Sequence, residues 1–140
     1  NTNTIFIADR YTTSNMLYQA AKIQSLKEKE DYLNWLWDLE FNKIQIPVPD
    51  LVLFLDVSSS ITRKLTENRP SKIDNNNTKD IHENNPIYQE ESYNNSKYLI
   101  DKYSWIQINC MNSRGMKGIL EIHQEIYEKV NEFLKNKAEV

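Results

Sequence analysis

The sequence predicts a mixed α/β domain, with a parallel sheet and helices on both of its faces. Two short apolar runs, residues 4–8 and 51–57, have the length and nearly continuous hydrophobicity of strands buried on both sides. Between them, residues 14–46 carry apolar side chains at the three- and four-residue spacing of amphipathic helices. Strands that alternate with helices are typical of parallel sheets, and 140 residues are enough for one domain, residues 1–140.

The first connection is expected to contain two helices. The charged stretch from Lys27 to Asp31 is interpreted as the turn between them. Pro47 and Pro49 are expected to end the second helix, because residues that precede proline avoid the helical conformation. The chain would then enter the second strand.

The second half of the chain continues the alternation of strands and helices. Residues 70–86 are polar, include the run from Asp74 to Asn77 and lack periodicity, so we expect a lid loop there. The elements predicted around this loop are a helix over residues 61–68, capped by residues 58–60, a helix over 87–103, a weaker strand over 105–110 and a final helix over 117–134.

Composition excludes some classes of partner. The net charge of −3 provides no basic field that would attract nucleic acid. The longest apolar run is interrupted by Asp56 and is too short to span a bilayer, so no membrane partner is expected. Cys110 is the single cysteine, which fits a reducing compartment, and the cytoplasm is the expected location.

The segment after the first apolar run carries the most chemical information. An Asp9-Arg10 pair offers a carboxylate for a metal-bound water or a hydroxyl, and a planar guanidinium that can grip a phosphate through two hydrogen bonds. The start of the next helix adds free backbone N–H groups. The alternative is that Asp9 caps this helix and Arg10 is solvated.

Two longer patterns resemble the thymidylate kinase family. Residues 49–57 read Pro-Asp-Leu-Val-Leu-Phe-Leu-Asp-Val, which is similar to a strand of that family, and they follow the first pattern in the family's order. The resemblance implies a three-layer P-loop kinase fold that transfers the γ-phosphoryl group of ATP to dTMP, giving dTDP, with Mg²⁺. The residues of the first pattern are Asp9, Arg10, Tyr11, Ser14, Tyr18 and Gln19.

The resemblance assigns roles around the acceptor nucleotide. Arg10 would hold the phosphate of dTMP, and Asp9 would lie near the magnesium and the transferring group. Asn15 and Gln19 would face the thymine ring, and Ser14 belongs to the same substrate-binding segment. Tyr18 would pack against the deoxyribose, although plain core packing is an equally good interpretation.

The resemblance also assigns the donor side. Arg63 and Arg69 stand where the family has the arginines that lead into its lid, and they would act on the donor phosphates. Asn109 and Cys110 would border the adenine of ATP, although a small buried thiol is the commoner role of a cysteine. The four residues Asp80-Ile81-His82-Glu83 match the closing lid motif only in part, and Lys72 and Lys79 are more simply read as surface lysines.

The chain lacks the Gly-Lys-Ser/Thr loop that cradles donor phosphates, and its only glycines are Gly115 and Gly118. We therefore expect this loop and a further strand in an upstream segment of the same or another chain, and expect this chain alone to be inactive.

No metal site is expected, because His82 and His123 have no partner at ligand spacing. The open alternatives are a noncatalytic nucleotide-binding or assembly module and another nucleoside monophosphate or deoxynucleoside kinase. The aromatic residues 32–37 could form a homodimer face.

Overall fold

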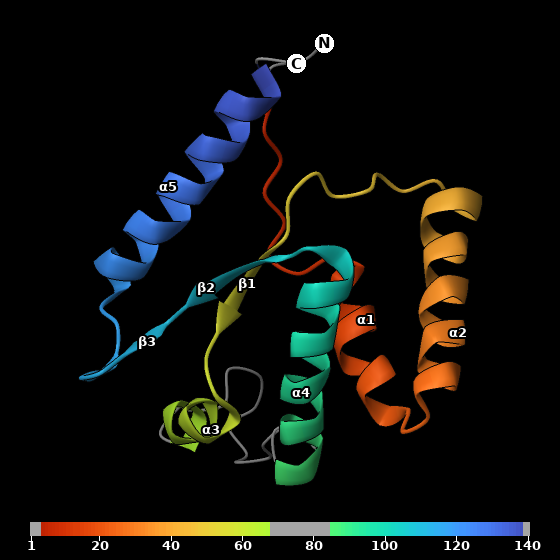
Figure 1. Cartoon of the computed structure of the whole chain (residues 1–140), viewed down its shortest axis with the longest axis horizontal. Coiled ribbons are helices and arrows are strands. Elements are labelled where there is room, and N and C mark those ends of the chain that lie inside the picture. Colours follow the sequence, from red (N-terminus) through yellow and green to blue (C-terminus); the bar gives the residue numbers. More distant parts are fainter. Residues whose placement is uncertain (1–3, 68–84, 139–140) are drawn as a thin grey trace, which may run out of the picture.

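The computed structural model describes residues 4–67 and 85–138. Helices dominate, and the strands are short (Figure 1). The elements are α1 (Thr13–Tyr18), η1 (Ala20–Lys22), α2 (Leu26–Trp37), η2 (Asp38–Lys43), β1 (Leu53–Asp56), α3 (Ser59–Glu67), α4 (Pro86–Tyr103), β2 (Ile106–Asn109), β3 (Met111–Asn112), β4 (Gly115–Met116) and α5 (Ile119–Ala138).

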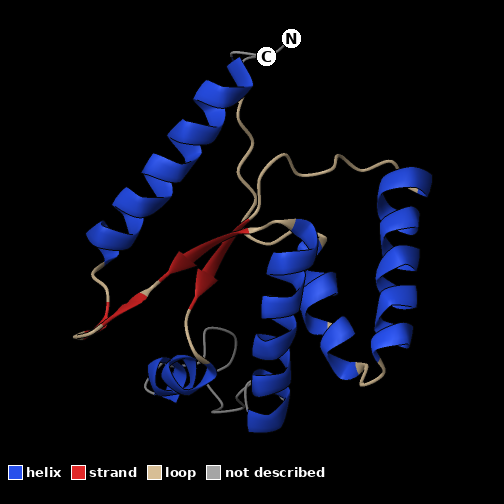
Figure 2. Cartoon of the chain, viewed as in Figure 1, coloured by secondary structure: helices blue, strands red, loops and turns tan. Residues whose placement is uncertain are grey.

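The predicted mixed α/β class is confirmed by a small parallel sheet. β1 and β2 pair in parallel, with Leu53 opposite Ile106 and Asp56 opposite Asn109. In Figure 2 these strands, drawn in red, lie between α5 on one side and the other long helices on the other. β2 is followed by the antiparallel β3–β4 hairpin, which the sequence did not predict.

The predicted strand over residues 4–8 is wrong. This segment has no regular secondary structure, and its apolar side chains are open to solvent: Ile5 is 61%, Phe6 89% and Ile7 93% exposed. Its composition is that of a buried strand, but a strand needs a hydrogen-bonded neighbour. Within the described residues, β1 and β2 pair only with each other.

The turn predicted over Lys27 to Asp31 is also wrong, because these residues lie inside α2. The helix begins earlier, where Ser25 Oγ accepts a hydrogen bond from Glu28 N at 3.4 Å. Lys27 and Asp31 form an exposed ion pair at 2.8 Å, four residues apart on the surface of the helix. The charges therefore mark the solvent face of α2, and the turn lies over residues 23–25.

The later helices and β2 are confirmed, with shifted ends. α3 begins at Ser59, and α5 continues to Ala138. The expected lid ends earlier than predicted, because Asn85 caps α4 by accepting a hydrogen bond from Tyr88 N at 3.1 Å, and Pro86 is the first residue of that helix. Residues 70–84 of the expected lid lie outside the described residues.

The hydrophobic core lies between α1, α2, η2 and α4. Trp37 stacks on Tyr103 with ring centroids 5.5 Å apart, which packs the end of α2 against the end of α4. None of the described helices has the length and apolar character needed to cross a membrane. The buried members of the core are Met16, Ala20, Leu33, Leu36, Phe41 and Leu99.

Candidate functional site

Arg10 and Tyr18, two residues of the first motif, lie together in space. The Arg10 guanidinium carbon is 5.7 Å from the centre of the Tyr18 ring, a distance at which a cation is attracted to the ring face. Arg10 has a φ of 72°, a left-handed conformation that is costly for any residue with a Cβ atom. The chain bends at Asp9 and Arg10 and turns at Thr12, just before α1 begins.

Asp9 is exposed beside Arg10. It does not cap α1, because Thr12 occupies the N-cap position of that helix. Capping by Asp9 is therefore wrong. The other part of that alternative, a solvated Arg10, agrees with the structure, in which Asp9 and Arg10 are both exposed.

Side chains from α4 hold α1 in place. Asn95 Nδ2 donates hydrogen bonds to the carbonyl oxygens of Met16 at 3.0 Å and Leu17 at 2.7 Å, and the Tyr88 hydroxyl donates to the carbonyl oxygen of Tyr18 at 2.9 Å. A helix of six residues is too short to be stable alone, so these contacts fix it. Asn95 was missed from sequence, although it lies on the stripe that joins Ser92 to Leu99.

The other predicted substrate-binding residues bond to neighbours within the helical region. Asn15 Nδ2 donates to Glu40 Oε1 at 3.2 Å, and Gln19 Oε1 accepts from Lys22 Nζ at 2.9 Å. Ser14 is half-buried in the first turn of α1, where its N–H donates to the carbonyl oxygen of Tyr11 at 2.9 Å. The exposed faces of Asn15 and Gln19 are the ones available to a ligand.

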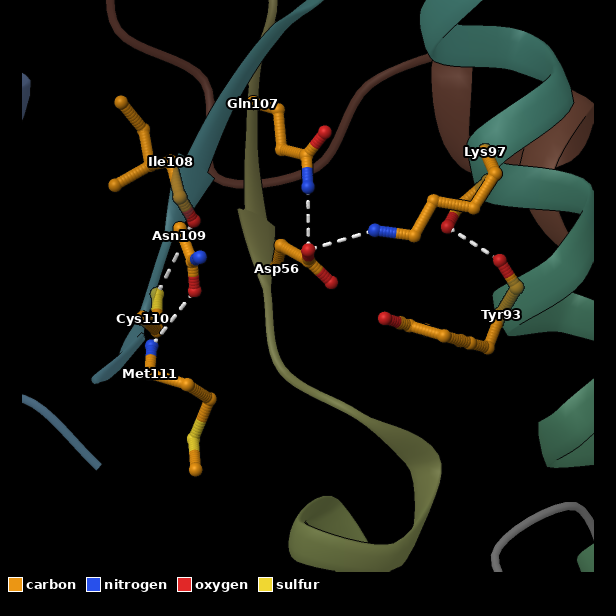
Figure 3. Close-up of polar contacts among 9 residues, drawn as sticks. Asp56, Tyr93, Lys97, Gln107, Ile108, Asn109, Cys110 and Met111 are labelled. Carbon is orange, nitrogen blue, oxygen red and sulfur yellow. Dashed lines mark hydrogen bonds and ion pairs between the residues drawn. The ribbon is translucent and has the colours of Figure 1, made fainter. Parts of the chain in front are cut away.

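A second polar cluster surrounds Asp56 at the carboxyl end of β1 (Figure 3). Lys97 Nζ on α4 lies 2.6 Å from Asp56 Oδ2, and Gln107 of β2 donates to the same oxygen. Lys97 also lies 4.8 Å from the centre of the Tyr93 ring. Sequence reasoning gave no role to Lys97 or Gln107, since each lies more than 40 residues from Asp56.

The charges of this cluster stabilise each other. Burial raises the pKa of Asp56, but hydrogen bonds from Lys97, Tyr93 and Gln107 outweigh burial and hold that pKa below its ordinary value. Burial lowers the pKa of Lys97, but hydrogen bonds to Asp56 and Tyr93 and the negative charge of Asp56 raise it overall. Both groups are therefore charged at neutral pH.

Two of the predicted donor-side residues, Asn109 and Cys110, lie at the end of β2. Asn109 Oδ1 accepts a hydrogen bond from Met111 N at 2.9 Å, and Cys110 is 1% exposed, with Sγ 3.5 Å from the carbonyl oxygen of Ile108. Burial raises the pKa of the Cys110 thiol, which makes it a poor nucleophile at neutral pH. Arg63 is half-buried on α3, whereas Arg69 lies outside the described residues, as do Lys72, Lys79 and His82.

The start of α1 lies near the beginnings of the two strands, whereas Asn109 and Cys110 lie at the end of β2. Thr13 and Met16 of α1 line a cavity of about 130 Å³ with Val52 and Trp105, which precede β1 and β2. Asn109 and Cys110 instead come at the end of β2. The structure thus brings Arg10 to Tyr18 but does not bring either residue to the predicted adenine border.

Neither a metal site nor a relative identifies the chain. Among the described residues, no group of three or more His, Cys, Asp or Glu side chains could hold a metal ion. Comparisons with protein-family models, curated proteins and solved structures found no match.

Proposed function

We propose that this chain forms the dTMP-binding part of a thymidylate kinase. The observation that carries the proposal is the placement of the Arg10 guanidinium over the Tyr18 ring. These are the residues of the family-like motif that would hold the phosphate and the sugar of one nucleotide. The complete protein would transfer the γ-phosphoryl group of ATP to dTMP.

Arg10 is suited to a phosphate. A guanidinium donates two parallel hydrogen bonds to a phosphate and is always charged at physiological pH. The left-handed backbone of Arg10 supports the proposal, because strained residues cluster at functional sites. Arg10 would hold the dTMP phosphate and neutralise the charge that develops when an oxygen of that phosphate bonds to the γ-phosphorus of ATP while the bond from that phosphorus to the β-phosphate oxygen breaks, releasing ADP.

Asn15 and Gln19 would face the thymine ring from the same short helix. Asn15 is one residue after Ser14, and Gln19 follows Tyr18 at the end of α1, so the sugar and base contacts come from about two helical turns, while Arg10 precedes the helix. The hydrogen bonds from Asn95 fix α1 on α4, and they would hold Asn15 and Gln19 in position to contact the base.

Mg²⁺ and ATP would bind with help from outside this sequence. Mg²⁺ is commonly held by one or two carboxylates together with substrate phosphates and water, and the exposed Asp9 carboxylate beside Arg10 fits that role. When bound, the ion neutralises phosphate charge. The Gly-Lys loop for the donor phosphates would be supplied by a segment of the same or another polypeptide.

A homodimer through α2 is part of the same proposal. Trp35 is 54% exposed, and its ring centroid lies 5.8 Å from that of Tyr32, so α2 exposes an aromatic pair. Leu26 is also exposed, but it lies nine residues away, on the opposite side of the helix. Trp37 contributes nothing to the exposed pair, because it stacks on Tyr103 in the core. Sedimentation of a Trp35→Ser variant as a monomer, with the native chain a dimer, would support this part.

The central test is the binding of dTMP, measured by calorimetry with the native chain and Arg10→Ala. We expect at least a tenfold loss of affinity, since hydrogen bonds to charged groups contribute about 1.5–3 kcal/mol. Arg10→Lys should bind with intermediate affinity because it keeps the charge and loses the two-pronged geometry. The matched control is Arg114→Ala, in the exposed β3–β4 turn. Equal losses in both alanine variants, or equal binding of thymidine and dTMP, would contradict the proposal.

A further inference from the structure

Glu40 is a buried carboxylate that the proposed function does not use. It is 8% exposed and lies in η2, a π-helical turn in which Ile44 N donates to the carbonyl oxygen of Leu39 at 2.9 Å. Its Oε1 accepts the hydrogen bond from Asn15, while its Oε2 is buried with no hydrogen-bond partner among the described residues. A buried carboxylate with one neutral hydrogen bond is costly, so its burial against Asn15 suggests a role beyond packing.

The contact between Glu40 and Asn15 determines which way the Asn15 amide faces. A carboxylate can only accept hydrogen bonds, so the NH₂ group of Asn15 must point toward Glu40. The other end of the amide, Oδ1, is then the atom that the exposed Asn15 side chain presents to a ligand. A neutral partner such as glutamine can donate as well as accept, and it would allow either orientation.

We infer that Glu40 is a positioning residue that sets the base preference of the site through Asn15. The inference rests on the proposed function, in which Asn15 faces the base. An outward-facing Oδ1 is an acceptor, and it matches the N3–H group of thymine or uracil. Cytosine carries an unprotonated N3 acceptor at the same place, so the two acceptors would face each other without a proton. The site should therefore favour bases with an imide N–H group.

The first measurement tests the contact without any ligand. In NMR spectra of the native chain, the Asn15 side-chain NH₂ should exchange slowly with solvent and show nuclear Overhauser contacts to η2. Glu40→Leu removes the acceptor, and Asn15 should lose this protection while the backbone spectrum stays folded. A native chain with a freely exchanging, contact-free Asn15 amide would overturn the positioning role.

The second measurement is the ratio of the dissociation constants for dCMP and dTMP. We expect the native chain to favour dTMP and Glu40→Gln, which keeps the side-chain volume, to reduce that ratio at least tenfold by weakening dTMP and strengthening dCMP. The matched control is Glu28→Gln on the exposed surface of α2, which should leave the ratio unchanged.

The outcomes separate this inference from the proposed function. If Glu40→Gln weakens both nucleotides equally, Glu40 is only structural and the inference fails, while the proposed function stands. If the native chain binds neither nucleotide, the proposed function and the base preference both fail, and only the contact seen by NMR remains.

Discussion

The helical region and the strand region of this molecule treat their apolar side chains differently. In the helical region, α1, α2, η2 and α4 enclose a core in which Leu33 and Leu99 are both 0% exposed. In the strand region, α5 has no buried residue, and Ile119 and Leu120 at its start are 86% and 83% exposed. A sheet of two short strands has too little surface to cover a 20-residue helix. Most of the packing energy of the described fold therefore lies in the helical region.

The largest expected effect compares one leucine from each region. Leu99→Ala should destabilise the protein by about 2–5 kcal/mol, since it opens a cavity in a filled core. Leu120→Ala should change the free energy of unfolding by no more than about 0.5 kcal/mol, because the side chain is already in water. Urea denaturation of both variants measures the difference. If both variants lose a similar free energy of unfolding, α5 is buried in solution, and the helical and strand regions do not differ in packing.

The Asp56–Lys97 pair joins the two regions, because it links β1 to α4. Lys97→Met leaves the Asp56 carboxylate poorly solvated, but the Lys97 side chain is 38% exposed, so the expected loss is reduced to about 1–2 kcal/mol. The control is Lys43→Met, whose pair with Asp38 is more exposed and should contribute less. An equal cost for the two variants would show that the link between the regions is unimportant.

The same pair predicts a pH dependence. The pKa of Asp56 is lower in the folded protein, so its contribution is present above its unfolded value, about 4, and is lost as the pH falls through the lower folded value. The raised pKa of Lys97 gives a contribution that is lost only as the pH rises above about 10.5. Denaturation at pH 2, 4 and 7 should show the native chain and Lys97→Met converging at the acid end. A constant difference down to pH 2 would contradict this assignment.

The smallest expected effect is at Arg10, where the chain enters the helical region. Arg10→Gly should be more stable than Arg10→Ala by about 1 kcal/mol, because glycine adopts a positive φ without a steric penalty. Both variants lose the contact with Tyr18. The difference between their free energies of unfolding therefore reports the cost of the positive φ at residue 10. Guanidinium denaturation of the two variants checks it, and equal stabilities would show that Arg10 is not left-handed in solution.

Sequence patterns correctly predicted the elements whose side-chain spacing matches a single type of secondary structure. The helices over residues 87–103 and 117–134 and the two paired strands are present because their side-chain spacing decides their type. Residues 4–8 show the limit of such reasoning, since hydrophobicity indicates burial but cannot supply a pairing partner. The run from Lys27 to Asp31 shows another, because charges on a helix surface and in a turn have the same composition.

The candidate site was predictable in its residues more than in its contacts. Arg10 was named from the chemistry of the Asp-Arg pair, and Tyr18 from the resemblance to a known family. Their contact joins the segment before α1 to the end of that helix. Glu40 and Asn95 had no local signal strong enough to identify them, because their roles depend on atoms of α1 that are 25 and 78 or more residues away. Long-range polar contacts of this kind depend on the packing of whole helices.

The π-helical turn η2 has a consequence for insertions and deletions. A π turn holds one more residue than an α turn, and each α-helical residue advances the chain by about 100°. Removing Asn42 would let this turn close as an ordinary α turn, which completes the same rotation with one residue fewer. Residues 44–52, which lead into β1, would then leave the helix from about the same side. A deletion at this turn should therefore keep the direction from which the chain enters the sheet, whereas the same deletion inside α2 would rotate the following chain by about 100°.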